Sequence, residues 1–153
     1  MWFDSCKPDQ CEEVVPVITF KDISVFADTT IGKLTITFKD CDGDIGLSEG
    51  DTLPPYHFSG SNYYNLKCKY IELQNGVWVE KKDLEPPFFY RTPVITPEGK
   101  NKTLEGDIEV TLDPSWYLLP IVSPYDTFKY KIQLIDRALN VSNSVETPIL
   151  VRP

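Results

Sequence analysis

Residues 128–134 read Phe-Lys-Tyr-Lys-Ile-Gln-Leu, a strict alternation of apolar and polar side chains. The same period of two recurs in residues 34–39, Leu-Thr-Ile-Thr-Phe-Lys, and in residues 107–112, Asp-Ile-Glu-Val-Thr-Leu. Such alternation is typical of antiparallel strands that bury one face and expose the other. Apolar residues nowhere recur at the spacing of an amphipathic helix over three turns, so the sequence predicts no long helix.

The alternating runs are short and are separated by turn residues. Asn75-Gly76 is the clearest turn, because this dipeptide favours the positive φ angles of a type I′ turn, and residues 66–73 and 77–82 should therefore form a hairpin. A segment expected to be an edge strand or an irregular connection is bracketed by Pro86, Pro87, Pro93 and Pro97. The predicted strands are residues 16–26, 32–39, 63–73, 77–82, 88–95, 104–112, 127–136 and 144–151.

This succession of short strands favours an all-β fold, an Ig-like antiparallel β-sandwich of seven to eight strands with Greek-key connections. A barrel is the alternative. The 153 residues fit one domain, residues 16–153. Residues 1–15 show no periodicity, and we expect them to form a flexible tether. Polar or helix-breaking residues dominate their second half: Lys7, Pro8, Asp9, Gln10, Glu12 and Glu13.

The formal charge of the chain is −8, from 15 basic and 23 acidic residues. Nucleic-acid binding needs clustered lysine and arginine, so the charge disfavours that class of partner, and it equally disfavours electrostatic attachment to an anionic membrane. The sequence also lacks an apolar run of about 18 residues, the length that a membrane-spanning helix requires.

The densest chemical signal is the acidic loop, residues 40–51, in which five of twelve residues are acidic. Asp40, Asp42 and Asp44 alternate with smaller residues and match the first, third and fifth positions of an EF-hand loop. The match fails at Ile45 and Asp51, and no flanking helices are predicted. We therefore interpret the segment as a Ca²⁺ loop of a β-protein, with a solvated acidic turn without metal as the alternative.

Topology suggests a second source of ligands. In a seven-strand sandwich, the loop after the second strand and the loop after the sixth lie at the same end, and the later loop here is residues 136–143. Asp136 and Asn140 are candidates to complete the coordination, whereas Arg137 is a candidate to pair with the carboxylates instead. The predicted metal ligands are Asp40, Asp42, Asp44, Asp51 and Asp136.

Nothing in the sequence indicates catalysis. His57 is the only histidine, so any Ser-His-Asp or Cys-His arrangement would have to use it, and nothing in its neighbours, residues 54–58, marks it as a catalytic base. No glycine-rich phosphate loop or H-E-x-x-H motif occurs. We expect a binding or structural module and no enzyme. Most aromatic residues should pack in the core, but some fall in loop-like stretches and would form a protein-binding patch or a sugar-stacking platform. These binding-surface candidates are Tyr63, Tyr64, Phe88, Phe89 and Trp116.

The four cysteines are Cys6, Cys11, Cys41 and Cys68. The absence of a C-x-x-C pair disfavours a zinc ribbon. Four cysteines allow three disulfide pairings, and buried or free thiols are a further alternative.

Two runs carry a resemblance to known proteins. Leu34–Leu47, LTITFKDCDGDIGL, resembles a strand and loop common in small lipoproteins of Bacteroidota bacteria, and Tyr130–Pro148 resembles the closing hairpin of Ig-like or fibronectin-type domains. Residues Phe3-Asp4-Ser5-Cys6 also resemble a lipobox. The resemblance implies a lipid on Cys6, and with Cys6 acylated we expect Cys41 to pair with Cys68 in a disulfide.

The sequence and the resemblance together predict a non-catalytic outer-membrane lipoprotein on the periplasmic or surface face of the membrane. Its expected role is that of an accessory or binding subunit of a cell-envelope protein complex, with an acidic loop stabilised by Ca²⁺. The expected partner is a protein of the cell envelope, the membrane is reached only through the lipid anchor, and no nucleic acid is bound. The alternative is a carbohydrate-binding module of the cell surface, and a small hydrolase ranks last.

Overall fold

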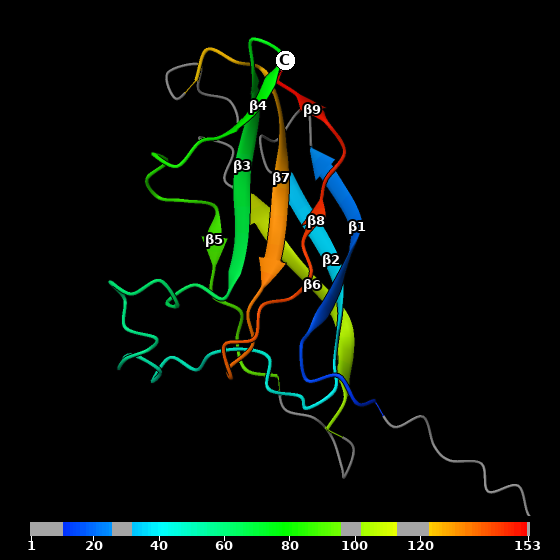
Figure 1. The fold of residues 1–153 in the computed structure, drawn as a ribbon, viewed down its shortest axis with the longest axis vertical. Coiled ribbons are helices and arrows are strands. Elements are labelled where there is room, and N and C mark those ends of the chain that lie inside the picture. Colours follow the sequence, from blue (N-terminus) through cyan, green and yellow to red (C-terminus); the bar gives the residue numbers. More distant parts are fainter. Residues whose placement is uncertain (1–10, 26–31, 96–101, 113–122, 153) are drawn as a thin grey trace, which may run out of the picture.

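The computed structural model describes residues 11–25, 32–95, 102–112 and 123–152 (Figure 1). These ranges contain strands and no helix, as the period of two predicts, and none of them includes a helix suited to crossing a bilayer. The strands are β1 (Val17–Val25), β2 (Gly32–Asp40), β3 (Leu66–Gln74), β4 (Val77–Glu80), β5 (Phe89–Tyr90), β6 (Leu104–Leu112), β7 (Thr127–Leu134), β8 (Val145–Glu146) and β9 (Leu150–Val151).

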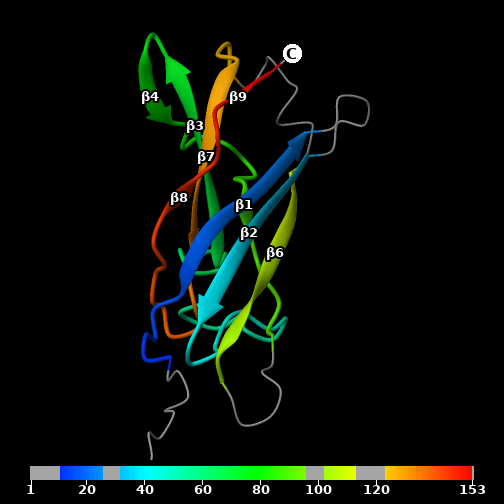
Figure 2. The same ribbon diagram turned by 90° about the vertical axis from the view of Figure 1, so that its right-hand side faces the viewer.

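The strands form two antiparallel sheets that pack face to face, so the predicted sandwich is confirmed (Figures 1 and 2). The first sheet has the order β1-β2-β6, and the second has the order β4-β3-β7-β8, in which β5 also pairs with β3 and β9 with β7. The chain therefore crosses between the sheets after β2, before β6 and after β6. These crossings bring loops that are distant in sequence to the same end of the molecule.

The core lies between the sheets, and alternate residues of each long strand fill it. On β2 and β7 every second side chain is buried, as the sequence alternation predicts. Aromatic rings dominate the second sheet: the rings of Tyr70 and Phe128 are stacked with centroids 4.9 Å apart, and Phe88 meets Tyr130 edge-on at 5.3 Å. Phe88 is only 6% exposed, so the prediction that it belongs to a binding surface is wrong. It follows a proline-rich bend and points inward to cover Tyr130.

The hairpin between β3 and β4 is confirmed. Gln74 and Val77 are register partners, which leaves Asn75 and Gly76 as the two turn residues with φ angles of 51° and 83°. Both angles are positive, as a type I′ turn requires.

Two predicted strands differ most from the structure. The segment 88–95 contributes only the two residues of β5, and 144–151 is split into β8 and β9. The split falls at Thr147-Pro148, where Pro148 has no N–H for the ladder. At this break the Thr147 hydroxyl replaces a backbone acceptor of the ladder and accepts a hydrogen bond from the Tyr130 amide at 3.0 Å.

The predicted disulfide between Cys41 and Cys68 is wrong. Cys41, the first residue after β2, is bonded to Cys11, and their Cα atoms are 5.3 Å apart. Cys68 lies on the inward face of β3 together with Leu66 and Tyr70 and is a buried free thiol. Burial raises the pKa of this thiol, which makes Cys68 unreactive in the folded protein. Cys6 and Trp116, the predicted lipidation site and one predicted surface aromatic, lie outside the described residues.

Candidate metal centre

The acidic loop after β2 and the loop after β7 meet at one end of the sandwich, as the topology predicts (Figure 1). Two backbone amides of the later loop bind Asp44: the Arg137 amide donates to its carbonyl oxygen at 3.1 Å, and the Ala138 amide donates to Oδ2 at 2.9 Å. These contacts hold together two segments that are 94 residues apart in sequence.

Three of the predicted metal ligands form a carboxylate triad at this junction: Asp40, Asp44 and Asp136. One carboxylate oxygen from each lies within 4.8 Å of the others, a spacing at which the group can hold a metal ion. Asp40 is the last residue of β2 and is 0% exposed, whereas Asp136 follows β7 and is 1% exposed. Because both flanking strands belong to the core, the backbone at these two residues is well supported.

Each carboxylate of the triad is held by a nearby amide. The Asp44 amide donates to Asp40 Oδ2 at 3.0 Å, and the Asn140 backbone amide and side-chain Nδ2 donate to the two oxygens of Asp136 at 2.7 and 2.8 Å. Asn140, predicted as a possible ligand, thus orients Asp136. These contacts fix how the carboxylates point without neutralising their charge.

The remaining oxygens are the most informative feature of the site. Asp40 Oδ1, Asp42 Oδ1 and Asp44 Oδ1 are all buried and have no hydrogen-bond partner. A buried polar atom left unpaired costs about 1–3 kcal/mol, and more when it carries charge. Three such oxygens in one loop are therefore a substantial cost, which coordination to a cation would remove.

The electrostatics agree with this geometry. Burial, followed by interaction with Asp42, raises the pKa of Asp40 to about 7. Burial and the charges of Asp136 and Asp42 also raise the pKa of Asp44. Crowded carboxylates resist ionisation unless a positive charge lies among them. Without metal, repulsion among the ionised carboxylates therefore destabilises the folded protein at this junction.

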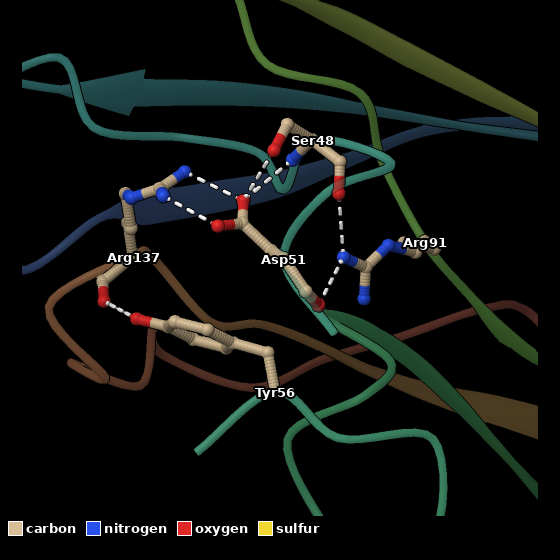
Figure 3. Close-up of polar contacts among 5 residues, drawn as sticks. All are labelled: Ser48, Asp51, Tyr56, Arg91 and Arg137. Atoms are coloured by element: carbon tan, nitrogen blue, oxygen red, sulfur yellow. Dashed lines mark hydrogen bonds and ion pairs between the residues drawn. The ribbon is translucent and has the colours of Figure 1, made fainter. Parts of the chain in front are cut away.

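Asp51 lies outside the triad, although the sequence suggested it as a ligand. Its carboxylate forms an end-on, bidentate pair with the Arg137 guanidinium: Nη1 donates to Oδ2 at 2.8 Å and Nη2 to Oδ1 at 2.6 Å. It also accepts hydrogen bonds from the Ser48 amide and hydroxyl (Figure 3). Together these donors hold the pKa of Asp51 below its usual range, with the Ser48 amide contributing most. The alternative prediction, that Arg137 pairs with a loop carboxylate, is correct for Asp51.

A second arginine, Arg91, clamps the same loop. Its Nη2 donates to the carbonyl oxygens of Ser48 and Asp51 at 2.7 and 2.9 Å (Figure 3). Its Nη1 donates to the carbonyl oxygen of Tyr63 at 2.9 Å. On the other side of the loop, the Tyr56 hydroxyl donates to the Arg137 carbonyl oxygen. Sequence reasoning missed Arg91, because nothing around it distinguishes an arginine that binds backbone carbonyls from a surface one.

The predicted aromatic surface is only partly assembled. Tyr63, Tyr64 and Phe89 are half-buried neighbours, but their rings meet edge-on, with interplanar angles of 78° and 65° between successive pairs. Among the described residues, the most exposed large apolar side chains are instead Leu53 at 75% and Phe58 at 72%, both in the connection from β2 to β3.

The fold and the site define an all-β sandwich with a buried acidic triad at one end, where two loops meet. A scan against protein-family models and searches among curated proteins and solved structures find no match to this chain.

Proposed function

We propose that this protein is a non-catalytic binding module of the cell envelope, in which a Ca²⁺ ion stabilises the loops that contact a partner protein. The carboxylate triad of Asp40, Asp44 and Asp136, with its unpaired buried oxygens, carries the proposal. A module of this kind needs no reacting group, and the one histidine, His57, contacts its neighbours Ser59 and Phe58 in an exposed loop.

The chemistry of the triad favours Ca²⁺. All of its ligand atoms are carboxylate oxygens, with no imidazole or thiolate among them, and such hard donors favour Ca²⁺, Mg²⁺ or Mn²⁺ over zinc or copper. Ca²⁺ accepts six to eight oxygens at about 2.3–2.6 Å in flexible geometry, whereas Mg²⁺ requires a near-ideal octahedron and keeps most of its water. A loop with several carboxylates and further carbonyl oxygens suits Ca²⁺ better.

The cysteines support the proposed compartment. Stable disulfides persist in oxidising environments such as the periplasm or the cell surface, and the Cys11–Cys41 bond supports such a location. Extracellular Ca²⁺ modules bind with dissociation constants of about 0.1–1 mM, which is sufficient where Ca²⁺ is abundant. A lipid on Cys6 would place the domain at the outer membrane.

The loop end also offers a surface for a protein partner. Leu53 and Phe58 are exposed at positions on either side of Tyr56, which is tied to the Arg137 carbonyl. Apolar side chains presented on an anchored loop lose little conformational freedom on binding. The edge-on packing of Tyr63, Tyr64 and Phe89 does not favour the alternative of carbohydrate binding, because a sugar platform requires coplanar rings.

The metal proposal is tested by thermal unfolding in EDTA and in 10 mM Ca²⁺. A site with a dissociation constant of about 0.1–1 mM would stabilise the fold by about 1.4–2.7 kcal/mol. This corresponds to a rise in Tm of about 3–10 °C for a domain of this size. The increase should be absent in Asp44→Asn and retained in Glu49→Gln, which removes an exposed charge from the same loop. An unchanged Tm of the wild-type protein at 10 mM Ca²⁺ would contradict a stabilising site.

The binding proposal is tested by cross-linking in intact cells that make the protein, followed by purification from the membrane fraction. We expect one partner in stoichiometric amount, and the double change Leu53→Ser and Phe58→Ser should reduce its recovery at least about 5-fold, as loss of two central apolar anchors does. Val77→Ser is the matched control, because Val77 is also exposed but lies in the β3–β4 hairpin at the opposite end of the molecule (Figure 1). Equal recovery of the partner with the double variant and with Val77→Ser would show that the loop is not part of the interface.

A further inference from the structure

The Cys11–Cys41 disulfide joins the candidate metal loop at the residue between two of its carboxylates. Cys41 lies between Asp40, a member of the triad, and Asp42, whose Oδ1 is one of the unpaired buried oxygens. The bond links this residue to the segment that precedes β1, and the two cysteines are 30 residues apart in sequence. The only covalent cross-link among the described residues thus falls within the candidate site.

The rest of the loop shows what the cross-link adds. Asp40 is held by the β2–β6 ladder, where its register partner is Leu104, and Asp44 is held by the amides of Arg137 and Ala138. Between these two anchors, residues 41–43 belong to no strand. The disulfide supplies the intermediate anchor, at the point where the backbone sets the directions of the neighbouring carboxylates.

We infer that disulfide formation and Ca²⁺ binding are thermodynamically coupled: the oxidised protein binds Ca²⁺ more tightly, and bound Ca²⁺ protects the disulfide from reduction. The inference rests on the proposed function, because it requires the triad to bind Ca²⁺. An uncross-linked loop has more conformations to lose when its carboxylates converge on an ion, and this loss reduces affinity. Coupling of this kind is reciprocal, so each event changes the other by the same factor.

The redox step is an ordinary thiol–disulfide exchange. A dithiol such as dithiothreitol attacks the bond between Cys11 and Cys41, and its two sulfurs end as a cyclic disulfide. The bond between the cysteines accepts two electrons and breaks, and each sulfur leaves as a thiol with one proton from the reductant. The protein then holds the same carboxylates on a loop that lacks its intermediate anchor.

The test measures Ca²⁺ affinity by calorimetry in a Cys6→Ser background, so that Cys6 contributes no thiol. Reduced protein and Cys11→Ser should bind Ca²⁺ about 5- to 50-fold more weakly than oxidised protein, within the usual range of coupling between sites. Dithiothreitol should not weaken binding further in Cys11→Ser, which is the control for effects of the reductant itself. Near-ultraviolet circular dichroism verifies that the reduced protein and the variant remain folded.

A second measurement requires no change at the disulfide. The equilibrium constant for reduction by dithiothreitol should fall by the same factor in saturating Ca²⁺, and Asp44→Asn should abolish this effect. Equal affinity of the oxidised and reduced proteins, or reduction that is indifferent to Ca²⁺, would overturn the coupling and leave the metal site intact. A lack of Ca²⁺ binding by the oxidised protein would overturn the proposed function along with the coupling.

Discussion

Asp40 combines two properties that seldom occur together in one residue: it ends a core strand, and its carboxylate is fully buried with one oxygen unpaired. Proteins retain such groups at functional sites, where strain is offset by a ligand. Asp136 has the same burial, but Asn140 satisfies both of its oxygens. The unpaired carboxylate oxygens of the site therefore all lie on the acidic loop, and a cation bound on that side of the site would stabilise the protein most.

The raised pKa of Asp40, about 7 against an ordinary value near 4, predicts how the stability of the metal-free protein depends on pH. The folded state keeps this proton at pH values where the unfolded chain has released it. The contribution of Asp40 is therefore largest below about pH 4 and is lost as the pH rises to about 7. Ca²⁺ binds the ionised carboxylate, so its stabilising effect should grow over the same range.

Thermal unfolding in EDTA between pH 4.5 and 8 checks this dependence. Asp40→Asn removes the titrating group but keeps an oxygen that can accept the hydrogen bond from Asp44. The Tm of the wild-type protein should therefore decline relative to that of the variant as the pH rises, and the difference should become constant above about pH 7. Parallel curves would show that Asp40 titrates normally.

At the scale of elements, the first part of the long connection from β2 to β3 is supported by the segment after β5. The Leu47 amide donates to the Thr92 carbonyl at 3.0 Å, and the Ile95 amide donates to the Ile45 carbonyl at 3.3 Å. Arg91 extends this support through the carbonyls of the loop. The acidic loop is thus part of the packed structure, which explains how it can hold carboxylates away from water.

Gly46 lies where these two segments approach most closely. Its φ is +104°, and a Cβ atom there would lie 2.1 Å from the Pro93 carbonyl oxygen. Gly46→Ala should therefore lower the free energy of unfolding by at least about 2 kcal/mol, since both the backbone angle and the space exclude a side chain. It should also weaken Ca²⁺ binding, because Asp44 is two residues away. Urea denaturation measures the first effect and calorimetry the second.

Gly50→Ala is the matched control within the same loop. A Cβ atom at Gly50 meets nothing closer than the Ser48 hydroxyl at 3.8 Å, so the change should stay within about 0.5 kcal/mol of the wild type. Similar losses for the two variants would mean that the loop is sensitive to any substitution and that the contact with Pro93 is not special.

At the scale of the whole molecule, the strands were the most predictable part. Alternation of apolar and polar residues located the long strands to within a few residues, and Asn75-Gly76 specified the hairpin. Topology then placed the two loops at one end, which brought Asp136 to Asp40 and Asp44. The incorrect predictions concern side chains that have more than one available partner. Asp51 pairs with Arg137 and lies outside the triad, Phe88 packs in the core, and Cys41 is bonded to Cys11.

The sequence by itself therefore determined the sandwich, the hairpin and the concentration of carboxylates in one loop. These depend on side-chain period and turn chemistry, which act over a few neighbouring residues. Only the tertiary structure decided which carboxylates converge, which cysteines form the disulfide and which aromatic rings lie outside the core. Those outcomes depend on contacts between segments as distant in sequence as Asp40 and Asp136. Packing, burial and competing partners there choose among side chains that are equivalent in the sequence.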